Sequence, residues 1–137
     1  MPKYLRITCG LLLLGILVIG VFFVQQRRHR IPYNIDVQLM LMRVADSYKR
    51  SLDQKNYDRA IELKDCLYLL AVERDLISMC QAGKTLEVQN LMAASTNQPT
   101  PRFLEHYNEV LASELSEEQY SHLRALRRDY KLEKYFE

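Results

Sequence analysis

The stretch that divides this chain is residues 7–24, which read ITCGLLLLGILVIGVFFV without a charge or a proline. A helix of this length rises about 27 Å, close to the ~30 Å hydrocarbon core of a bilayer. In lipid every backbone polar group must be satisfied within its own segment, and a helix does this. The pattern therefore predicts one membrane-spanning helix, with residues 1–30 as an N-terminal anchor and residues 31–137 as a separate domain.

Basic side chains flank the apolar stretch at both ends. We expect five of them to lie at the membrane interface beside lipid headgroups: Lys3, Arg6, Arg27, Arg28 and Arg30. The stretch is longer than the roughly 7–15 apolar residues of a signal peptide, and no small-x-small cleavage site accompanies it, which favours an uncleaved anchor. More arginines follow the stretch than precede it, which by the positive-inside rule puts the carboxy-terminal domain on the cytoplasmic or equivalent reducing side.

Charge and cysteine content narrow the functional classes. The first thirty residues carry five basic and no acidic side chains, whereas the remainder carries 14 basic against 17 acidic ones. A mildly acidic domain lacks the positive surface that a phosphate backbone requires, so nucleic-acid binding is not expected. Cys9 lies in the apolar stretch, and Cys66 and Cys80 are too far apart for a disulfide if they share one helix. No Asn-x-Ser/Thr sequon occurs, and both observations fit a reducing side.

Beyond the anchor, apolar residues recur at spacings of three and four, and no alternating strand pattern appears. Asn34, Thr100 and Ser116 are predicted N-caps, and Gly83 is a predicted C-terminal cap. These signals predict an all-α fold, with a small bundle of about five helices at 34–54, 57–82, 85–94, 100–111 and 116–135. The middle of the second helix, CLYLLAV at 66–72, is apolar on all sides, which places this helix at the centre of the bundle.

The turn between the first two helices carries a familiar pattern. Its features are Tyr57-Asp58, Ala60, Leu63-Lys64-Asp65, Leu67 and Leu70. Residues 52–70 thereby resemble the UVR motif, a helical hairpin of nucleotide-excision-repair and Clp-adaptor proteins. Residues 56–61 are also similar to the turn and second helix of a tetratricopeptide repeat, although no second copy follows at a period of thirty-four. The resemblance implies a protein-docking hairpin without a catalytic role, in which Tyr57 and Leu63 fill the seam beside the small Ala60.

No catalytic or metal-binding constellation is visible. His29 is expected to be solvated, and His106 and His122 fall on different predicted helices. The carboxylates of the second helix, Glu73 included, alternate with basic residues, which is typical of a solvent-exposed face with salt bridges. Arg127 is expected to belong to the basic end of the last helix. We therefore expect no metal, no cofactor, no small-molecule substrate and no enzymatic activity.

The expected function is that of a non-enzymatic accessory or scaffold subunit of a large membrane-associated assembly, such as an organellar complex or the membrane-facing layer of a viral capsid. The alternative is a membrane-tethered adaptor that recruits a soluble protein reversibly through the 34–82 hairpin. The expected partners are the lipid bilayer and other protein subunits. Apolar residues that fall away from the main helix stripes are the docking candidates: Leu39, Met42, Leu69 and Met79.

Overall fold

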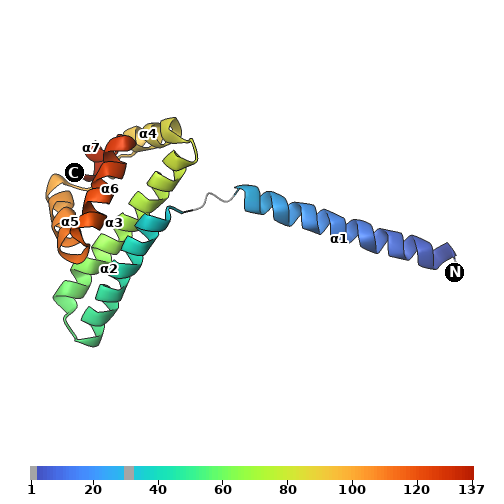
Figure 1. The fold of residues 1–137 in the computed structure, drawn as a ribbon, viewed down its shortest axis with the longest axis horizontal. Helices are drawn as coiled ribbons and strands as arrows, with labels where there is room; N and C mark the ends of the chain where they lie inside the picture. The colour runs from blue at the N-terminus through green and yellow to red at the C-terminus, as the bar shows by residue number, and fades with distance from the viewer. Residues whose placement is uncertain (1–2, 30–32) are drawn as a thin grey trace. The chain divides into compact units, whose positions relative to one another are not determined.

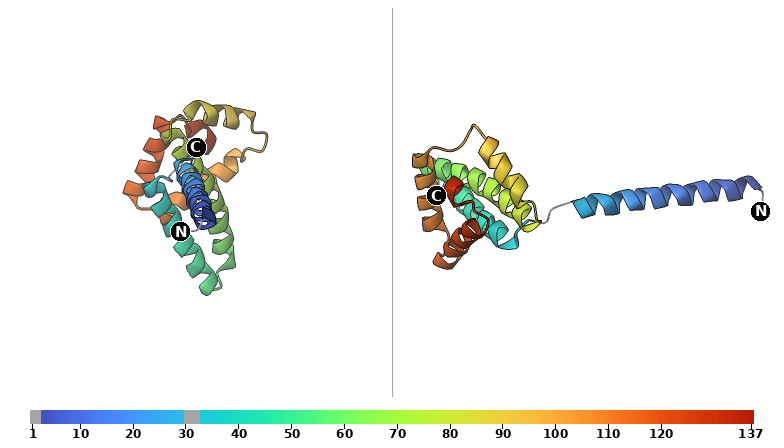
Figure 2. Two further views of the ribbon diagram at one scale, coloured as in Figure 1. Left: turned by 90° about the vertical axis from the view of Figure 1, so that its right-hand side faces the viewer. Right: turned by 90° about the horizontal axis from the view of Figure 1, so that it is seen from above.

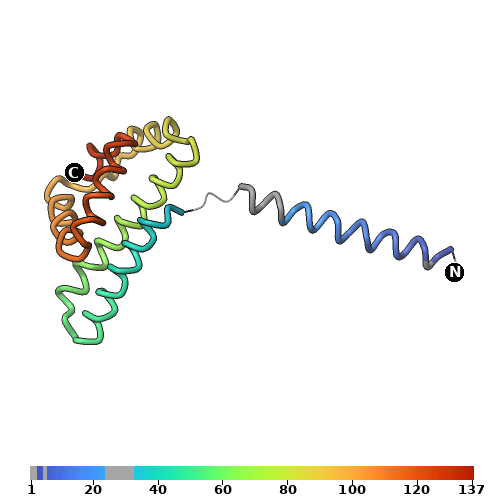
Figure 3. The backbone as a smooth tube through the Cα atoms, viewed as in Figure 1, coloured from blue at the N-terminus to red at the C-terminus, as the bar shows by residue number. Residues whose placement is uncertain are grey.

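The computed structural model describes residues 3–29 and 33–137, without the side chains of residues 5 and 24–29. In these ranges all the regular secondary structure is helical, with seven helices and no strand (Figures 1 and 3). This confirms the all-α prediction. The chain divides between residues 32 and 33 into two compact units, a single helix and a helical bundle. The bundle has six helices where about five were predicted, because the last predicted helix is split in two.

The first unit is helix α1 (Lys3–His29). Its segment Arg6–Phe23 has a mean hydropathy of 2.4 and no buried residue, so by length and composition it is long and apolar enough to cross a membrane. Lys3 and Arg6, two of the predicted interface residues, are exposed near its start. The other three, Arg27, Arg28 and Arg30, lie outside the residues whose side chains are described.

Helices α2 (Ile35–Asp53) and α3 (Tyr57–Gln81) form the hairpin that supports the bundle. The side chain of Asn34 accepts the Val37 N–H at 2.9 Å, as the predicted N-cap should. α2 buries one stripe against its neighbours, made of Val37, Met40, Val44 and Ser51. The hairpin therefore begins and ends where the capping residues predicted it would.

Helix α3 packs against α2, α4 and α5, and in this sense it is central. It is not surrounded, however, because Tyr57, Ile61 and Tyr68 are exposed along one side. The seam of the hairpin is filled by Ala60 and Leu63. The expectation that Tyr57 shares this seam is wrong, since the first turn of α3 points the ring outward.

Four further helices cover the inner face of the hairpin: α4 (Thr85–Ala94), α5 (Pro101–Glu114), α6 (Glu117–Asp129) and α7 (Glu133–Phe136) (Figure 2). Thr100 caps α5 by accepting the Phe103 N–H, with Pro101 in the first turn. Ser116 and Gln119 form the predicted capping box of α6, each side chain accepting the other residue's N–H at 3.1 Å. Both predicted N-caps are confirmed.

The predicted last helix breaks at Lys131, whose φ of 56° lies in the left-handed region. The Leu132 N–H donates to the Arg127 carbonyl at 2.8 Å, and the Lys131 N–H donates to the Arg128 carbonyl at 3.2 Å. This pair of bonds is a Schellman motif, which usually places glycine at the left-handed position. The break turns Leu132 into the core and lets α7 pack beside α6.

Replacing Lys131 with glycine should stabilise the bundle. A non-glycine residue in the left-handed region is strained by about 1 kcal/mol, so we expect Lys131→Gly to raise the free energy of unfolding by about 0.5–1 kcal/mol. Urea unfolding of the 33–137 fragment measures this. The matched control is Lys49→Gly, an exposed position inside α2, which should lower stability by a similar amount. A loss of stability in both variants would show that Lys131 is not strained.

Candidate protein-docking surface

The interior of the bundle holds a charged pair, Glu73 of α3 and Arg127 of α6, both fully buried. Arg127 Nε donates to Glu73 Oε2 at 2.9 Å, and Arg127 Nη2 donates to Glu73 Oε1 at 2.7 Å. The Tyr107 hydroxyl donates to Glu73 Oε1 at 3.0 Å, and Arg127 Nη1 donates to Asn108 Oδ1 at 2.8 Å. We call these four residues the buried polar cluster.

The cluster joins four helices. Asn108 of α5 also donates to the Phe136 carbonyl of α7 at 2.6 Å, and Tyr120 of α6 donates to Asn108 Oδ1 at 3.3 Å. In the described part of the chain every buried side-chain nitrogen and oxygen has a hydrogen-bond partner. Fully satisfied networks of this kind specify a unique core.

Electrostatics within the cluster favour fixed protonation states. Burial works against a charged guanidinium, but the hydrogen bonds and negative charge of Glu73 outweigh it and raise the pKa of Arg127. Burial, reinforced by the charge of Glu73, raises the pKa of the Tyr107 phenol well above its ordinary value. Because the side chains of Glu73 and Arg127 are inaccessible to solvent, the cluster is placed to support the fold and does not contact a solvent-borne ligand.

A second polar cluster lies near the tip of the hairpin. Glu114 of α5 accepts from Ser47 of α2 and from Arg59 of α3, both at 2.6 Å. Arg59 also pairs with Glu62 at 3.0 Å. Partial burial disfavours the charged carboxylate, yet the hydrogen bonds from Ser47 and Arg59 and the charge of Arg59 together lower the pKa of Glu114. This contact holds α5 against both helices of the hairpin.

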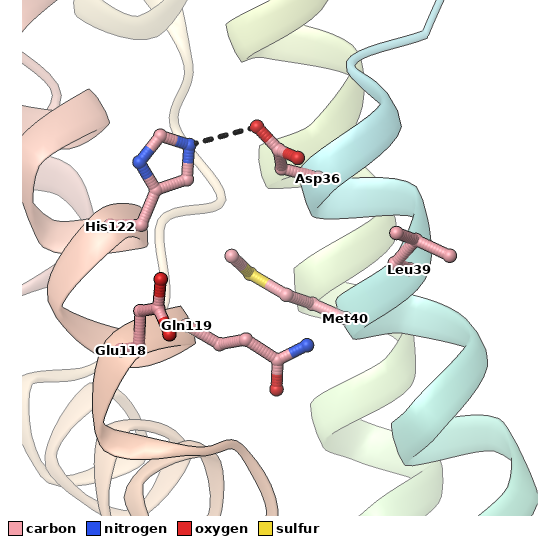
Figure 4. A pocket seen from close by; sticks show the side chains of 6 residues that line it. All are labelled: Asp36, Leu39, Met40, Glu118, Gln119 and His122. Carbon is pink, nitrogen blue, oxygen red and sulfur yellow. Dashed lines mark hydrogen bonds and ion pairs between the residues drawn. The ribbon is translucent and has the colours of Figure 1, made fainter.

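A groove of about 360 Å³ opens between α2 and α6. It is lined by Asp36, Leu39, Met40, Glu118, Gln119 and His122. His122 Nε2 lies 3.1 Å from Asp36 Oδ2 across the groove (Figure 4). Met40 points from α2 toward α6, whereas Leu39 points away from α6 (Figure 4). Charged and polar side chains thus surround a small apolar area, as at the rim of a protein interface.

The exposed side of α2 continues from Leu39. Ile35, Leu39 and Met42 follow at spacings of four and three, so they fall within about 60° of one another on the helix. All three are exposed, Leu39 to 52% and Met42 to 54%. We call them the outer stripe of α2. Since the opposite side of α2 fills the core, this helix is apolar on two sides.

The four docking candidates separate into two groups. Leu39 and Met42 are exposed, and they lie in the outer stripe of α2. Leu69 is only 6% exposed and belongs to the hydrophobic core, so its placement on an exposed side of the helix is corrected. Met79 is half-buried and packs against the core. Both depart from the prediction because α3 packs against three other helices, α2, α4 and α5, which the spacing of its own apolar residues could not show.

Other reactive side chains are not gathered into a site. Within the described ranges no group of three His, Cys, Asp or Glu residues is close enough to hold a metal ion. Cys66 and Cys80 are free and buried. Burial, with a contribution from the charge of Glu114, raises the pKa of Cys66 to about 12, so its thiol stays protonated.

No family model, curated protein or solved structure matches the chain. The resemblance of residues 52–70 to the UVR motif is therefore supported only by the sequence pattern itself. The structure places them on a helical hairpin, and of these residues Tyr57, Ile61 and Tyr68 form an exposed stripe on α3.

The sequence did not predict the buried polar cluster that supports this surface. The expectation that Glu73 lies on a solvent-exposed face is wrong, because Glu73 is buried. Arg127 lies in the last turn of α6, at the basic end of that helix as expected, but its burial beside Glu73 was not predicted. The spacing of these two residues from their apolar neighbours indicated burial. Glu73 lies three residues after Leu70 and four before Ile77, and Arg127 lies four after Leu123, so each falls on the apolar stripe of its helix.

The Glu114 contact predicts a stability that depends on pH. A carboxylate whose pKa is lowered in the folded state contributes stability above its unfolded pKa, and this contribution is lost as pH falls through the folded pKa. The free energy of unfolding should therefore decline as pH drops below about 4.5. Glu114→Gln should be less stable at neutral pH and show a shallower decline, measured by urea unfolding at a series of pH values.

The control for this prediction is Ser47→Ala, which removes one of the hydrogen bonds to Glu114 and leaves Arg59 in place. In Ser47→Ala the free energy of unfolding should still decline at low pH, more steeply than in Glu114→Gln but less steeply than in the wild type. Parallel curves for wild type and Glu114→Gln would contradict the assignment.

Proposed function

We propose that this chain is a non-enzymatic membrane protein, held in the bilayer by α1, whose helical bundle serves as an accessory or scaffold subunit of a membrane-associated assembly. The observation that carries the proposal is the outer stripe of α2, where Leu39 and Met42 are exposed on a helix whose other side is fully packed. An apolar surface of this kind is typical of a protein interface.

The energetics favour contact with a partner at this position. Burying the exposed halves of Leu39 and Met42 stabilises a complex by roughly 1–2 kcal/mol each. The groove beside them adds carboxylates, an amide and an imidazole that offer hydrogen bonds at the edge of the contact. Apolar contact with a polar border is the usual anatomy of a stable interface.

A reversible adaptor is the second candidate, and the exposed stripe on α3 favours it. Tyr57, Ile61 and Tyr68 lie on the same 34–82 hairpin as the outer stripe of α2. The burial of Leu69 also removes one of the four apolar residues expected at a permanent interface. As an adaptor, the hairpin would bind a soluble partner reversibly.

Site-specific photo-crosslinking in native membranes tests the proposal. A photoreactive phenylalanine analogue at Leu39 or Met42 should give discrete protein adducts, because these side chains face the proposed partner. The same analogue at the exposed Glu105 of α5 should not give them. Equal adducts from all three positions, or none from Leu39 and Met42, would contradict a docking role for α2.

A high-salt wash of the membranes separates the two alternatives. Adducts formed after a high-salt wash indicate a permanent subunit, whereas adducts lost by that wash indicate the adaptor.

The membrane anchor is tested separately. The double variant Leu13→Arg, Leu14→Arg should oppose insertion of α1 by about 5–7 kcal/mol and release the chain into the soluble fraction. Continued resistance of this variant to carbonate extraction would contradict the membrane anchor.

A further inference from the structure

One end of the bundle gathers three helix termini. The Asn34 backbone N–H donates to Ser78 Oγ at 3.0 Å, and the Asn34 side-chain amide donates to Gln81 Oε1 at 3.0 Å. These bonds fix the start of α2 beside the end of α3. Gly83, with φ of 85°, then turns the chain into α4. The start of α2, the end of α3 and the start of α4 therefore lie at the same side of the bundle (Figures 1 and 2).

Exposed apolar side chains lie on the two helices that begin at this end. Ile35 is 75% exposed and Leu86 is 73% exposed, and Tyr33, two residues before Ile35, is also exposed. The Arg74 guanidinium lies 4.0 Å from the centre of the Tyr33 ring, which orients the ring. We call Tyr33, Ile35 and Leu86 the α2–α4 end patch. Leu86 lies on α4 and is exposed, so it belongs neither to the hydrophobic core nor to the outer stripe of α2.

Covalent geometry limits how far this patch lies from α1. The helix continues for six residues beyond Phe23, a rise of about 9 Å. Four further residues lead from His29 to Tyr33 and reach about 14 Å at most. Whatever the angle between the two units, Tyr33 therefore stays within about 25 Å of the end of the apolar segment, so the tether is short enough to keep the bundle next to the headgroup layer.

We propose that the α2–α4 end patch contacts the lipid surface of the bilayer that holds α1. This inference rests on the proposed membrane anchor and extends it to the bundle. Ile35 and Leu86 supply side chains that insert among the upper acyl chains, and a tyrosine ring suits the headgroup level. Lys84, exposed between α3 and α4, is placed to meet lipid phosphates, while Glu87 lies about 100° around α4 from Leu86.

The bilayer is favoured over a protein partner because of this covalent tether. A surface held near the membrane by its own chain meets lipid at high effective concentration, without a separate binding event. Ile35 belongs to both surfaces, whereas Leu39 and Met42, the rest of the outer stripe of α2, lie toward the hairpin tip and remain available to a protein partner.

The chain contains no tryptophan, so each introduced tryptophan is a unique fluorescent reporter. We would prepare the full chain as Ile35→Trp, Leu86→Trp, Tyr68→Trp and Leu13→Trp in phosphatidylcholine nanodiscs. Lipids brominated near the top or near the end of their acyl chains serve as shallow and deep quenchers. Tyr68 is the matched control because it is 75% exposed, like Ile35, but lies ten residues along α3 from Ser78.

The expected result is a blue-shifted emission at positions 35 and 86 that the shallow quencher reduces by more than half, with emission at position 68 unchanged. Equal emission and quenching at positions 35, 86 and 68 would overturn the lipid contact. A blue shift at 35 and 86 without quenching would mean that a second copy or another protein covers the patch, and would also overturn it.

Position 13 separates this inference from the proposed anchor. Strong deep quenching there shows that α1 spans the bilayer, so a failure at positions 35 and 86 then concerns the patch alone. Absence of deep quenching at position 13 would remove the anchor, and with it the inference. Circular dichroism of each variant checks that the helices are retained.

Discussion

The packing of α3, α5, α6 and α7 depends on the buried ion pair between Glu73 and Arg127. Two charges removed from water are stable only when each has its partner and every remaining hydrogen-bonding position is filled. Here Tyr107 and Asn108 complete the set, and Asn108 extends it to the backbone of Phe136. Helices α3, α5 and α6 must therefore be in place together, because the absence of any one leaves a hydrogen-bonding position of the buried pair unfilled, and the bond from Asn108 to Phe136 adds α7 to them. Such a pair adds little net stability over an apolar core, but it strongly disfavours alternative packings.

The same arrangement explains where the molecule presents its surfaces. α5, α6 and α7 are committed to the inner face of the hairpin, so the opposite sides of α2 and α3 stay uncovered and carry exposed apolar stripes. The groove beside Leu39 is shaped by the N-terminal cap of α6, because Gln119 both caps that helix and accepts from Arg43 of α2 at 3.3 Å. A rigid interior thus supports a surface whose position relative to the hairpin is fixed, as a docking subunit requires.

Local signals predicted much of this fold, and non-local packing set the rest. Caps such as Asn34, Thr100 and Ser116 act within one helical turn, so they could be read directly from the sequence. The break at Lys131 was missed because lysine occupies a position where glycine is the usual signal. Glu73 was placed on a solvent-exposed face because it is charged, and the burial of Arg127 was not foreseen for the same reason, since only their partners on other helices make burial possible. For the same reason the pattern of α3 alone could not show that its neighbours bury Leu69. Two of the four docking candidates, Leu39 and Met42, are exposed as predicted.

A double-mutant cycle on the ion pair tests the central claim most directly. The variants are Glu73→Gln, Arg127→Met and the two combined, unfolded by urea in the 33–137 fragment. Removing one partner should lower the free energy of unfolding by about 3–5 kcal/mol, because the other is left buried and unpaired. The combined variant should lose clearly less than the sum of the two single losses. Single variants that unfold within about 0.5 kcal/mol of wild type, with additive effects, would show that the pair does not organise the bundle.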